Sequence, residues 1–149
     1  MIKIICIGKI KEKYLKEAIE EYSKRLSKYT KLEIIELQDE PIIQKAKKIE
    51  AERIQKYIKD SDYIITLEIE GNNPTSEELS KKIETTLITN SNITFIIGGS
   101  YGLDNSIKER SNYKLSFSNL TFPHQLFRVI LLEQIYRSFK IINNENYHK

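Results

Sequence analysis

The feature that most constrains the fold of this chain is a regular alternation of short apolar runs with longer amphipathic stretches. Ile2–Ile7, Leu32–Leu37, Asp62–Leu67 and Ile93–Ile97 are short and apolar, as strands buried on both faces are. Tyr113–Phe117 is expected to be a fifth strand. Strands separated by helix-length segments pair in parallel, so the pattern predicts an α/β fold with a mostly parallel sheet flanked by helices.

The intervening segments carry the spacing and the start signals of helices. We predict helices at about Lys11–Lys28, from Pro41 onward, after Thr75, near Asp104–Arg110 and at about Pro123–Ile142. Thr75 and Glu78 stand three residues apart, which is the spacing of a capping box. Glu70–Pro74, which holds Gly71 and Asn72, is expected to be a turn.

The last predicted helix is unusually apolar. From Leu126 to Ile142, eleven of seventeen residues are apolar, including the unbroken run Val129–Leu132. A helix that faces a single core needs only one apolar stripe, so this helix is expected to bury more than one side. Either it lies centrally within a monomer or it forms the interface of a homodimer. Because a chain of 149 residues offers little room for a central helix, the homodimer is favoured.

Length and composition restrict the class of protein. The 149 residues suit one domain, residues 1–149, and 40% hydrophobic with 30% charged residues is ordinary for a globular protein. No segment approaches the roughly 20 apolar residues of a membrane span. The lone Cys6 lies in an apolar run and forms no internal disulfide, which suits a reducing compartment. We expect a cytoplasmic protein without a membrane partner.

The charge is uneven along the chain. The net charge is only +3, but residues 1–31 hold nine Lys and Arg against four Glu, a local net of +5. Such a segment could follow a phosphate backbone. On charge alone, a solvated helix face with mixed charges is the favoured explanation, so the charge does not identify a nucleic-acid partner.

Ligands of parallel sheets bind beyond the carboxyl ends of the strands, which points to the junctions after Leu67, Ile97 and Phe117. The turn Gly98–Gly102 lies at one of these junctions. It lacks the G-x-G-x-x-G order of dinucleotide sites and the Gly-Lys-Ser/Thr ending of phosphate-binding loops. A nicotinamide-dependent oxidoreductase is therefore disfavoured. What the glycines do indicate is a close approach of the backbone to a ligand or another segment.

Few residues suggest chemistry on their own. His124 and His148 have no partner at metal-ligand spacing, so we expect no metal site. His124 could cap the last helix, and His148 could be a disordered terminal residue. Arg128 and Arg137 lie within the apolar helix, where an arginine serves an interface ion pair or a phosphate contact, and spacing does not choose between these.

Three segments carry a specific resemblance. Phe95–Leu103 reads F-I-I-G-G-S-Y-G-L, Leu115–Tyr136 includes T-F-P-H-Q-L-F-R, and the chain ends in Tyr147-His148-Lys149. Together they resemble the ribosomal RNA large subunit methyltransferase H family of SPOUT-class methyltransferases. The resemblance implies a homodimer with a C-terminal deep trefoil knot, which no periodicity argument would predict because threaded chains are rare. It also implies that S-adenosylmethionine methylates N3 of a pseudouridine in large-subunit (23S) ribosomal RNA on the assembled ribosome, without a metal.

The resemblance also assigns site residues. The cofactor contacts that it implies are Leu67, Gly98, Gly99, Phe117, Ser118, Asn119, Leu120, Thr121 and Phe122. The candidates near the substrate are His124, Arg128, Arg137, Tyr147 and His148. We expect Tyr147 and His148 to position or deprotonate the base and the cationic residues to hold phosphates or stabilise negative charge. The rival hypothesis is a non-catalytic RNA- or ribosome-binding module on the same fold.

Overall fold

The computed structural model describes all 149 residues as one sheet with helices on both faces. The strands are β1 (Ile2–Ile7), β2 (Leu32–Leu37), β3 (Tyr63–Asn72), β4 (Ile93–Ile97) and β5 (Tyr113–Leu115). Their order in the sheet is β2-β1-β4-β3-β5, and every neighbouring pair is parallel. The prediction of a mostly parallel α/β sheet is confirmed.

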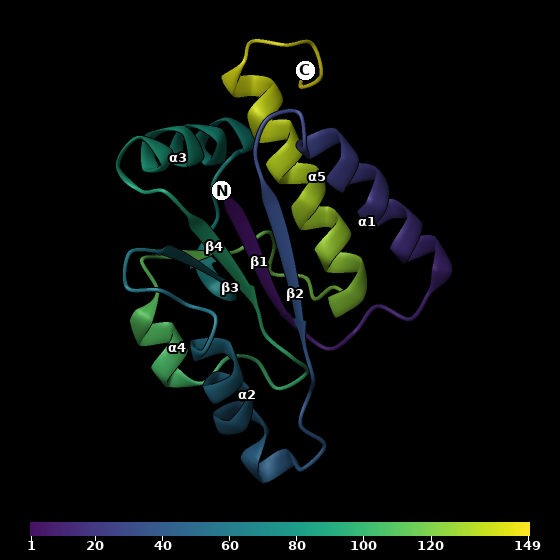
Figure 1. Cartoon of the computed structure of the whole chain (residues 1–149), viewed down its shortest axis with the longest axis vertical. Coiled ribbons are helices and arrows are strands. Elements are labelled where there is room, and N and C mark those ends of the chain that lie inside the picture. The colour runs from purple at the N-terminus through teal and green to yellow at the C-terminus, as the bar shows by residue number, and fades with distance from the viewer.

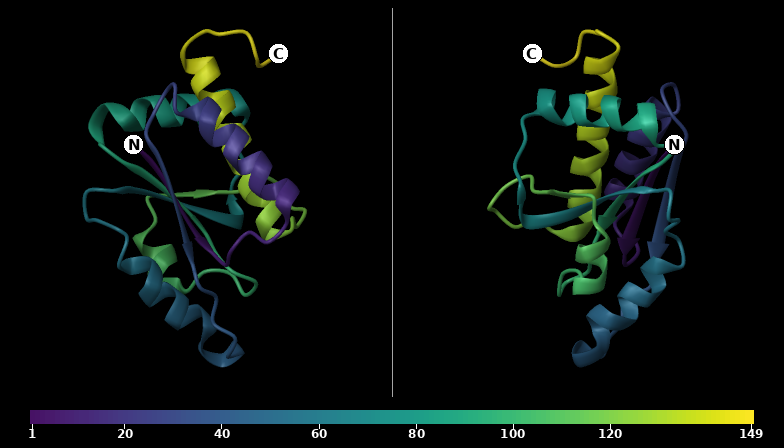
Figure 2. Two further views of the ribbon diagram at one scale, coloured as in Figure 1. Left: turned by 45° about the vertical axis from the view of Figure 1, so that its right-hand side comes forward. Right: turned by 90° about the vertical axis from the view of Figure 1, so that its left-hand side faces the viewer.

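Two layers of helices enclose the sheet (Figures 1 and 2). The helices are α1 (Lys13–Leu26), α2 (Ala46–Gln55), α3 (Ser76–Thr89), α4 (Asn105–Arg110) and α5 (His124–Ile142). One hydrophobic cluster joins the sheet to α1, α3 and α5, and a second joins it to α2 and α4. The two clusters place three helices on one face of the sheet and two on the other.

Strand β1 shows how the sequence builds both faces. Ile4 and Cys6 belong to the larger cluster, whereas Ile5 and Ile7 belong to the smaller one, as the two-residue period of a strand requires. Lys3 is only 5% exposed. Its ammonium donates to the carbonyl oxygen of Tyr57 at 3.0 Å and lies 3.4 Å from the Asp62 carboxylate, so this buried charge is paired.

Three predicted boundaries are wrong. Pro41 does not open a helix, because the chain bends there and makes a short 3-10 turn, η1 (Ile43–Lys45), before α2 begins. Strand β3 continues to Asn72 rather than ending at Leu67, so most of the predicted turn is strand. Strand β5 ends at Leu115, and the next residues form the loop that leads to α5.

Helix α5 lies between α1 and α3 and contacts both, as well as the sheet beneath it (Figure 1). Its expected burial on more than one side therefore occurs within the chain. The apolar excess of α5 does not by itself require a second copy, which corrects the argument that led from this helix to a dimer. No helix in the chain combines the length and the apolar character that a membrane crossing demands.

Candidate cofactor-binding site

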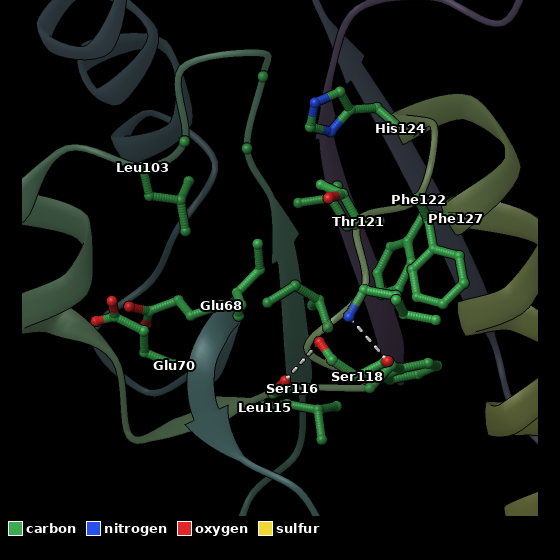
Figure 3. A pocket seen from close by; sticks show the side chains of 18 of the residues that line it. Glu68, Glu70, Leu103, Leu115, Ser116, Ser118, Thr121, Phe122, His124 and Phe127 are labelled. Atoms are coloured by element: carbon green, nitrogen blue, oxygen red, sulfur yellow. Dashed lines mark hydrogen bonds between the residues drawn. The ribbon is translucent and has the colours of Figure 1, made fainter.

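A cavity of about 400 Å³ lies beyond the carboxyl end of β4, between the last part of β3 and the loop that follows β5 (Figure 3). It is lined by three segments that are distant in sequence: Leu67–Glu70, Ile97–Leu103 and Leu115–Phe122. The first turn of α5 adds His124 and Phe127. The volume is within the range of sites for small molecules and cofactors.

The first segment is the extension of β3, which runs close to the backbone of β5. A Cβ atom on Gly71 would lie 2.8 Å from the carbonyl carbon and oxygen of Lys114, so only glycine permits this approach. Asn72 then accepts from the Ser116 amide at 2.7 Å, and the Asn73 side chain donates to the Ser116 carbonyl at 2.9 Å. These contacts hold the cavity's first and third segments together.

The second segment is the glycine turn after β4. The Gly102 amide donates to the Gly99 carbonyl at 3.0 Å, and Gly102 has a φ of +81°, a conformation that favours glycine. A Cβ atom on Gly98 would meet the Gly102 carbonyl carbon at 3.0 Å. The turn therefore needs glycine to close, and closing presents its backbone to the cavity, as the sequence predicted.

The third segment is a loop with its own hydrogen bonds. The Ser116 hydroxyl donates to the Ser118 carbonyl at 3.3 Å, and the Leu120 amide donates to the Ser118 hydroxyl at 3.0 Å (Figure 3). The ring of Phe127 lies 4.9 Å from the ring of Phe117 and 5.8 Å from that of Phe122, measured between centroids. The loop is thereby anchored to α5 while Leu120 stays 72% exposed at the cavity.

His124 is the titratable group of α5 that reaches the cavity (Figure 3). Partial desolvation, together with the nearby positive charge of Arg128, lowers the pKa of its imidazole below the usual value of 6.5. The ring is therefore neutral at pH 7 and has one nitrogen free to accept a proton or a hydrogen bond.

Arg128 lies one turn further along α5 and points into the protein. It is 3% exposed, and its guanidinium donates to Glu36 at 2.8 Å and to the carbonyls of Ile7 and Gly8 at 2.9 and 2.7 Å. These contacts join α5 to the carboxyl end of β1. The sequence left two roles for Arg128, an interface ion pair or a phosphate contact. The structure shows an ion pair within the chain, and the buried guanidinium is not placed to contact a phosphate.

The C-terminal tail folds back onto α5. The Tyr147 hydroxyl donates to Glu133 at 3.1 Å, and burial together with the Glu133 charge raises the pKa of Tyr147 to about 12. The His148 ring is held between Arg137 at 3.0 Å and Glu77 of α3 at 2.7 Å. Because Arg137 can only donate, Nδ1 of His148 accepts and Nε2 carries the proton that Glu77 accepts. The tail is ordered by these contacts, contrary to the disordered alternative.

The tail and the cavity of one chain are far apart. Helix α5 carries His124 at the cavity and Arg137 at the tail, 13 positions further along. At 1.5 Å per residue, these two positions are about 20 Å apart. The two views of Figure 2 also show the tail beyond the end of α5 that is distant from α4. The structure therefore brings His124 to the cavity but not Arg137, Tyr147 or His148.

Comparison with known proteins identifies the family. Residues 1–148 match a family described as "Predicted SPOUT methyltransferase". A protein of Methanococcus maripaludis is 60% identical, with 99% of each chain covered. Proteins named ribosomal RNA large subunit methyltransferase H are 57% identical in Clostridium botulinum and 55% identical in Clostridium perfringens, again with 99% of each chain covered. The chain belongs to the ribosomal RNA large subunit methyltransferase H family of SPOUT methyltransferases.

Most of the residues assigned from the family resemblance line the cavity. The predicted residues that do so are Leu67, Gly98, Gly99, Phe117, Ser118, Leu120, Thr121 and Phe122. Asn119 is exposed and is not among the residues that line the cavity. The positions that the resemblance implies for cofactor contacts thus come together from three segments of the chain.

Sequence reasoning missed the polar wall of the cavity. Glu68, Glu70 and Lys108 line it, and the two carboxylates lie together at one side in Figure 3. Glu68 and Glu70 are two residues apart on β3, and side chains at that spacing lie on the same face of a strand. The missing signal was the length of that strand, because ending it at Leu67 left Glu68 outside the strand and Glu70 in the predicted turn.

Proposed function

We propose that this protein transfers a methyl group from S-adenosylmethionine to ribosomal RNA of the large subunit. The observation that carries the proposal is the cavity, which the extension of β3 and the loops after β4 and β5 build from the residues expected to hold the cofactor. The names of its relatives state the same class of substrate. We further propose N3 of a pseudouridine on the assembled ribosome as the acceptor.

The cavity suits this cofactor in size and in chemistry. Leu67, Leu115, Phe117 and Leu120 supply apolar surface for an adenine ring, and the turn at Gly98 brings backbone close without a side chain between. When bound, S-adenosylmethionine supplies a methyl group activated by its sulfonium. The protein's part is to orient this group, exclude water and manage the proton of the acceptor nitrogen.

An imide nitrogen must lose its proton when it is methylated, so the site needs a group that accepts one. His124 meets this need from the cavity side, because its lowered pKa keeps the ring neutral at neutral pH. Tyr147 does not, because a pKa of about 12 keeps its hydroxyl protonated. We therefore assign His124 as the first candidate for the proton acceptor, with Tyr147 and Arg137 orienting the substrate. His148 is the second candidate, once its Nδ1 is released from Arg137.

A homodimer reconciles the position of the tail with a role in catalysis. Since the tail of one chain lies about 20 Å along α5 from its own cavity, we propose that it serves the cavity of a second copy. Val129 and Ile130 of α5 stay partly exposed, and Leu126 is 39% exposed, so apolar surface is present for such an interface. Release of His148 from Glu77 would then accompany substrate binding.

We also propose that residues 1–149 form a single methyltransferase domain whose C-terminal part is threaded as a deep trefoil knot, as in the family that it resembles. The support is the close crossing at Gly71, where the end of β3 passes against β5 just before the loop that lines the cavity. We expect the protein to act in the cytoplasm, where ribosomes are.

The experiment is transfer of a labelled methyl group from S-adenosylmethionine to purified ribosomes that lack the modification, with free ribosomal RNA as a parallel substrate. Incorporation at one nucleotide of the large-subunit RNA is expected with ribosomes. Cofactor binding without any incorporation would reject this substrate. If the cofactor did not bind either, the chain would be a non-catalytic RNA- or ribosome-binding module.

A further inference from the structure

The cavity has two chemically different sides. One is apolar, formed by Leu67, Leu115, Phe117 and Phe122, whereas the other carries the charged side chains of Glu68, Glu70 and Lys108. In Figure 3 the two labelled glutamates lie opposite Thr121 and His124 across the opening. A ligand that fills this cavity should therefore have one apolar end and one charged end.

The charged side of the cavity carries two negative side chains and one positive side chain, and Glu68 and Lys108 are not in direct hydrogen-bond contact. Glu68 is largely shielded, with a side chain 12% exposed, and it accepts from the Thr66 hydroxyl at 2.6 Å. The Lys108 ammonium lies 4.0 Å from the other Glu68 oxygen, and the Lys108 side chain is 38% exposed. At this separation the pair is too long for a direct hydrogen bond. Glu70 lies two residues further along the same face of β3, exposed at the rim.

We propose that Glu68, Glu70 and Lys108 bind the amino-acid end of the cofactor as a zwitterion clamp. The two carboxylates accept hydrogen bonds from its α-ammonium, and Lys108 pairs with its α-carboxylate. The inference rests on the proposed use of S-adenosylmethionine and adds the orientation in which the cofactor lies, with adenine against the apolar side.

The presence of both signs distinguishes this assignment from a contact with the ribose. The two ribose hydroxyls can be held by carboxylates alone, which would leave Lys108 paired only with Glu68 at 4.0 Å. A zwitterion needs an anionic and a cationic partner at once, and charge-assisted hydrogen bonds are about twice as strong as neutral ones. The Thr66 hydroxyl fixes the orientation of Glu68, so the carboxylate is preorganised for this contact.

The test compares ligands that differ only at this end, using calorimetry on the full chain. S-adenosylhomocysteine has the whole amino-acid end, decarboxylated S-adenosylhomocysteine lacks the α-carboxylate, and 5′-methylthioadenosine lacks both charged groups. The variants are Glu68→Gln with Glu70→Gln, and Lys108→Met. Glu109→Gln, on the exposed face of α4, is the matched control, and thermal unfolding checks that each variant folds.

The double glutamine variant should bind S-adenosylhomocysteine about 10–100-fold more weakly but bind 5′-methylthioadenosine as the unmodified protein does. Lys108→Met should weaken the binding of S-adenosylhomocysteine and leave the affinity for the decarboxylated ligand unchanged. If the double glutamine variant lost affinity equally for S-adenosylhomocysteine and 5′-methylthioadenosine, a ribose contact would replace the clamp. No loss of affinity for S-adenosylhomocysteine would also overturn it. If the unmodified protein bound none of these ligands, the proposed function itself would fail, which separates the two conclusions.

Discussion

Arg128 shows how one side chain can set the geometry of the site without touching it. Its guanidinium ties the start of α5, where His124 and Phe127 reach the cavity, to Glu36 of β2 and to the two carbonyls at the end of β1. The same Glu36 oxygen accepts from the Ile10 amide at 2.8 Å. A buried charge with this many partners is costly to remove, because each partner loses its donor.

Replacement of Arg128 should therefore destabilise the fold. Arg128→Met is expected to lower the free energy of unfolding by about 3 kcal/mol, since it strands the two carbonyls and part of the Glu36 carboxylate. Urea denaturation measures the change. Arg25→Met is the matched control: its side chain is 41% exposed, pairs with Glu21 across one helical turn and lies over the rings of Tyr22 and Tyr136, so its loss should cost about 1 kcal/mol. Equal effects of the two changes would contradict the assigned role of Arg128.

Cys6 is fully buried on β1, and burial raises the pKa of its thiol to about 11. At pH 8 only about one molecule in a thousand would carry the reactive thiolate, even if the reagent could reach it. We expect no reaction with a thiol-specific disulfide reagent at pH 8 in the folded protein and complete reaction after unfolding in guanidinium. Rapid modification under native conditions would show that β1 is accessible.

At the scale of elements, α3 connects the sheet to the tail. Its first turn is closed by the predicted capping box, in which the Thr75 hydroxyl accepts from the Glu78 amide at 3.1 Å and the Glu78 carboxylate accepts from the Thr75 amide at 3.1 Å. The same turn holds Ser76, bonded to Gln134 of α5, and Glu77, bonded to His148. The first turn of α3 therefore also helps to hold the C-terminal tail in place.

Removal of this cap should weaken α3 by a measurable amount. Thr75→Ala is expected to lower the free energy of unfolding by about 1 kcal/mol, because one amide of the first turn loses its acceptor. Chemical denaturation followed by circular dichroism gives the value. Thr85→Ala, an exposed position inside the same helix, should be neutral or slightly stabilising, since alanine has the higher helix propensity. A cost at Thr85 as large as that at Thr75 would rule out the cap as the cause.

At the scale of the whole molecule, the basic N-terminal segment lies at the edge of the sheet where the cavity opens. The Lys11 amide donates to the Gln125 side chain at 3.1 Å, which places this segment beside His124. Lys13 has a side chain 90% exposed and pairs only at 3.8 Å with Glu17. Both ammonium groups are therefore free to meet RNA phosphates near the opening.

Reversal of these two charges should weaken binding to ribosomes. Lys11→Glu with Lys13→Glu is expected to reduce the affinity about tenfold or more and to make it less sensitive to salt, while the affinity for S-adenosylhomocysteine is unchanged. Sedimentation with ribosomes at several salt concentrations measures both. Lys24→Glu with Lys81→Glu is the charge-matched control on exposed positions of α1 and α3. An equal effect of the control pair would mean that net charge, not position, governs binding.

The distance between the tail and the cavity of one chain predicts that each active site of a homodimer uses the tail of the other subunit. A chain lacking Tyr147–Lys149 should fold and bind the cofactor but lose methylation. A full-length chain with Gly98→Leu should lose the cofactor, because a side chain there would clash with Gly102 and fill the cavity. Neither chain alone should methylate ribosomes, but a mixture allowed to exchange subunits should regain activity, since one tail then meets one intact cavity. Absence of rescue in heterodimers shown to form would mean that each tail acts on its own chain.

The sequence determined the parallel sheet, because strands buried on both faces must be apolar throughout and helices beside them must carry one apolar stripe. The bounds of β1, β2 and β4 were predicted correctly, as was the Thr75 capping box. Each depends on hydrogen bonds or spacing within a few residues. The loops around Gly98 and Phe117 could also be located, since strand ends in such sheets share an edge, and Leu67 was correctly placed at the same edge although β3 continues beyond it.

The tertiary structure alone decided where the remaining groups went. β3 extends to Asn72 because the bare backbone of Gly71 packs on Lys114, more than 40 residues away, and this contact is what turns Glu68 and Glu70 into the cavity. Arg128 is buried because Glu36 and the end of β1 are folded against it. The tail lies on α5 and α3, away from its own cavity, because Glu133 and Glu77 hold it there. These contacts join residues distant in the chain, and local periodicity carries no information about them.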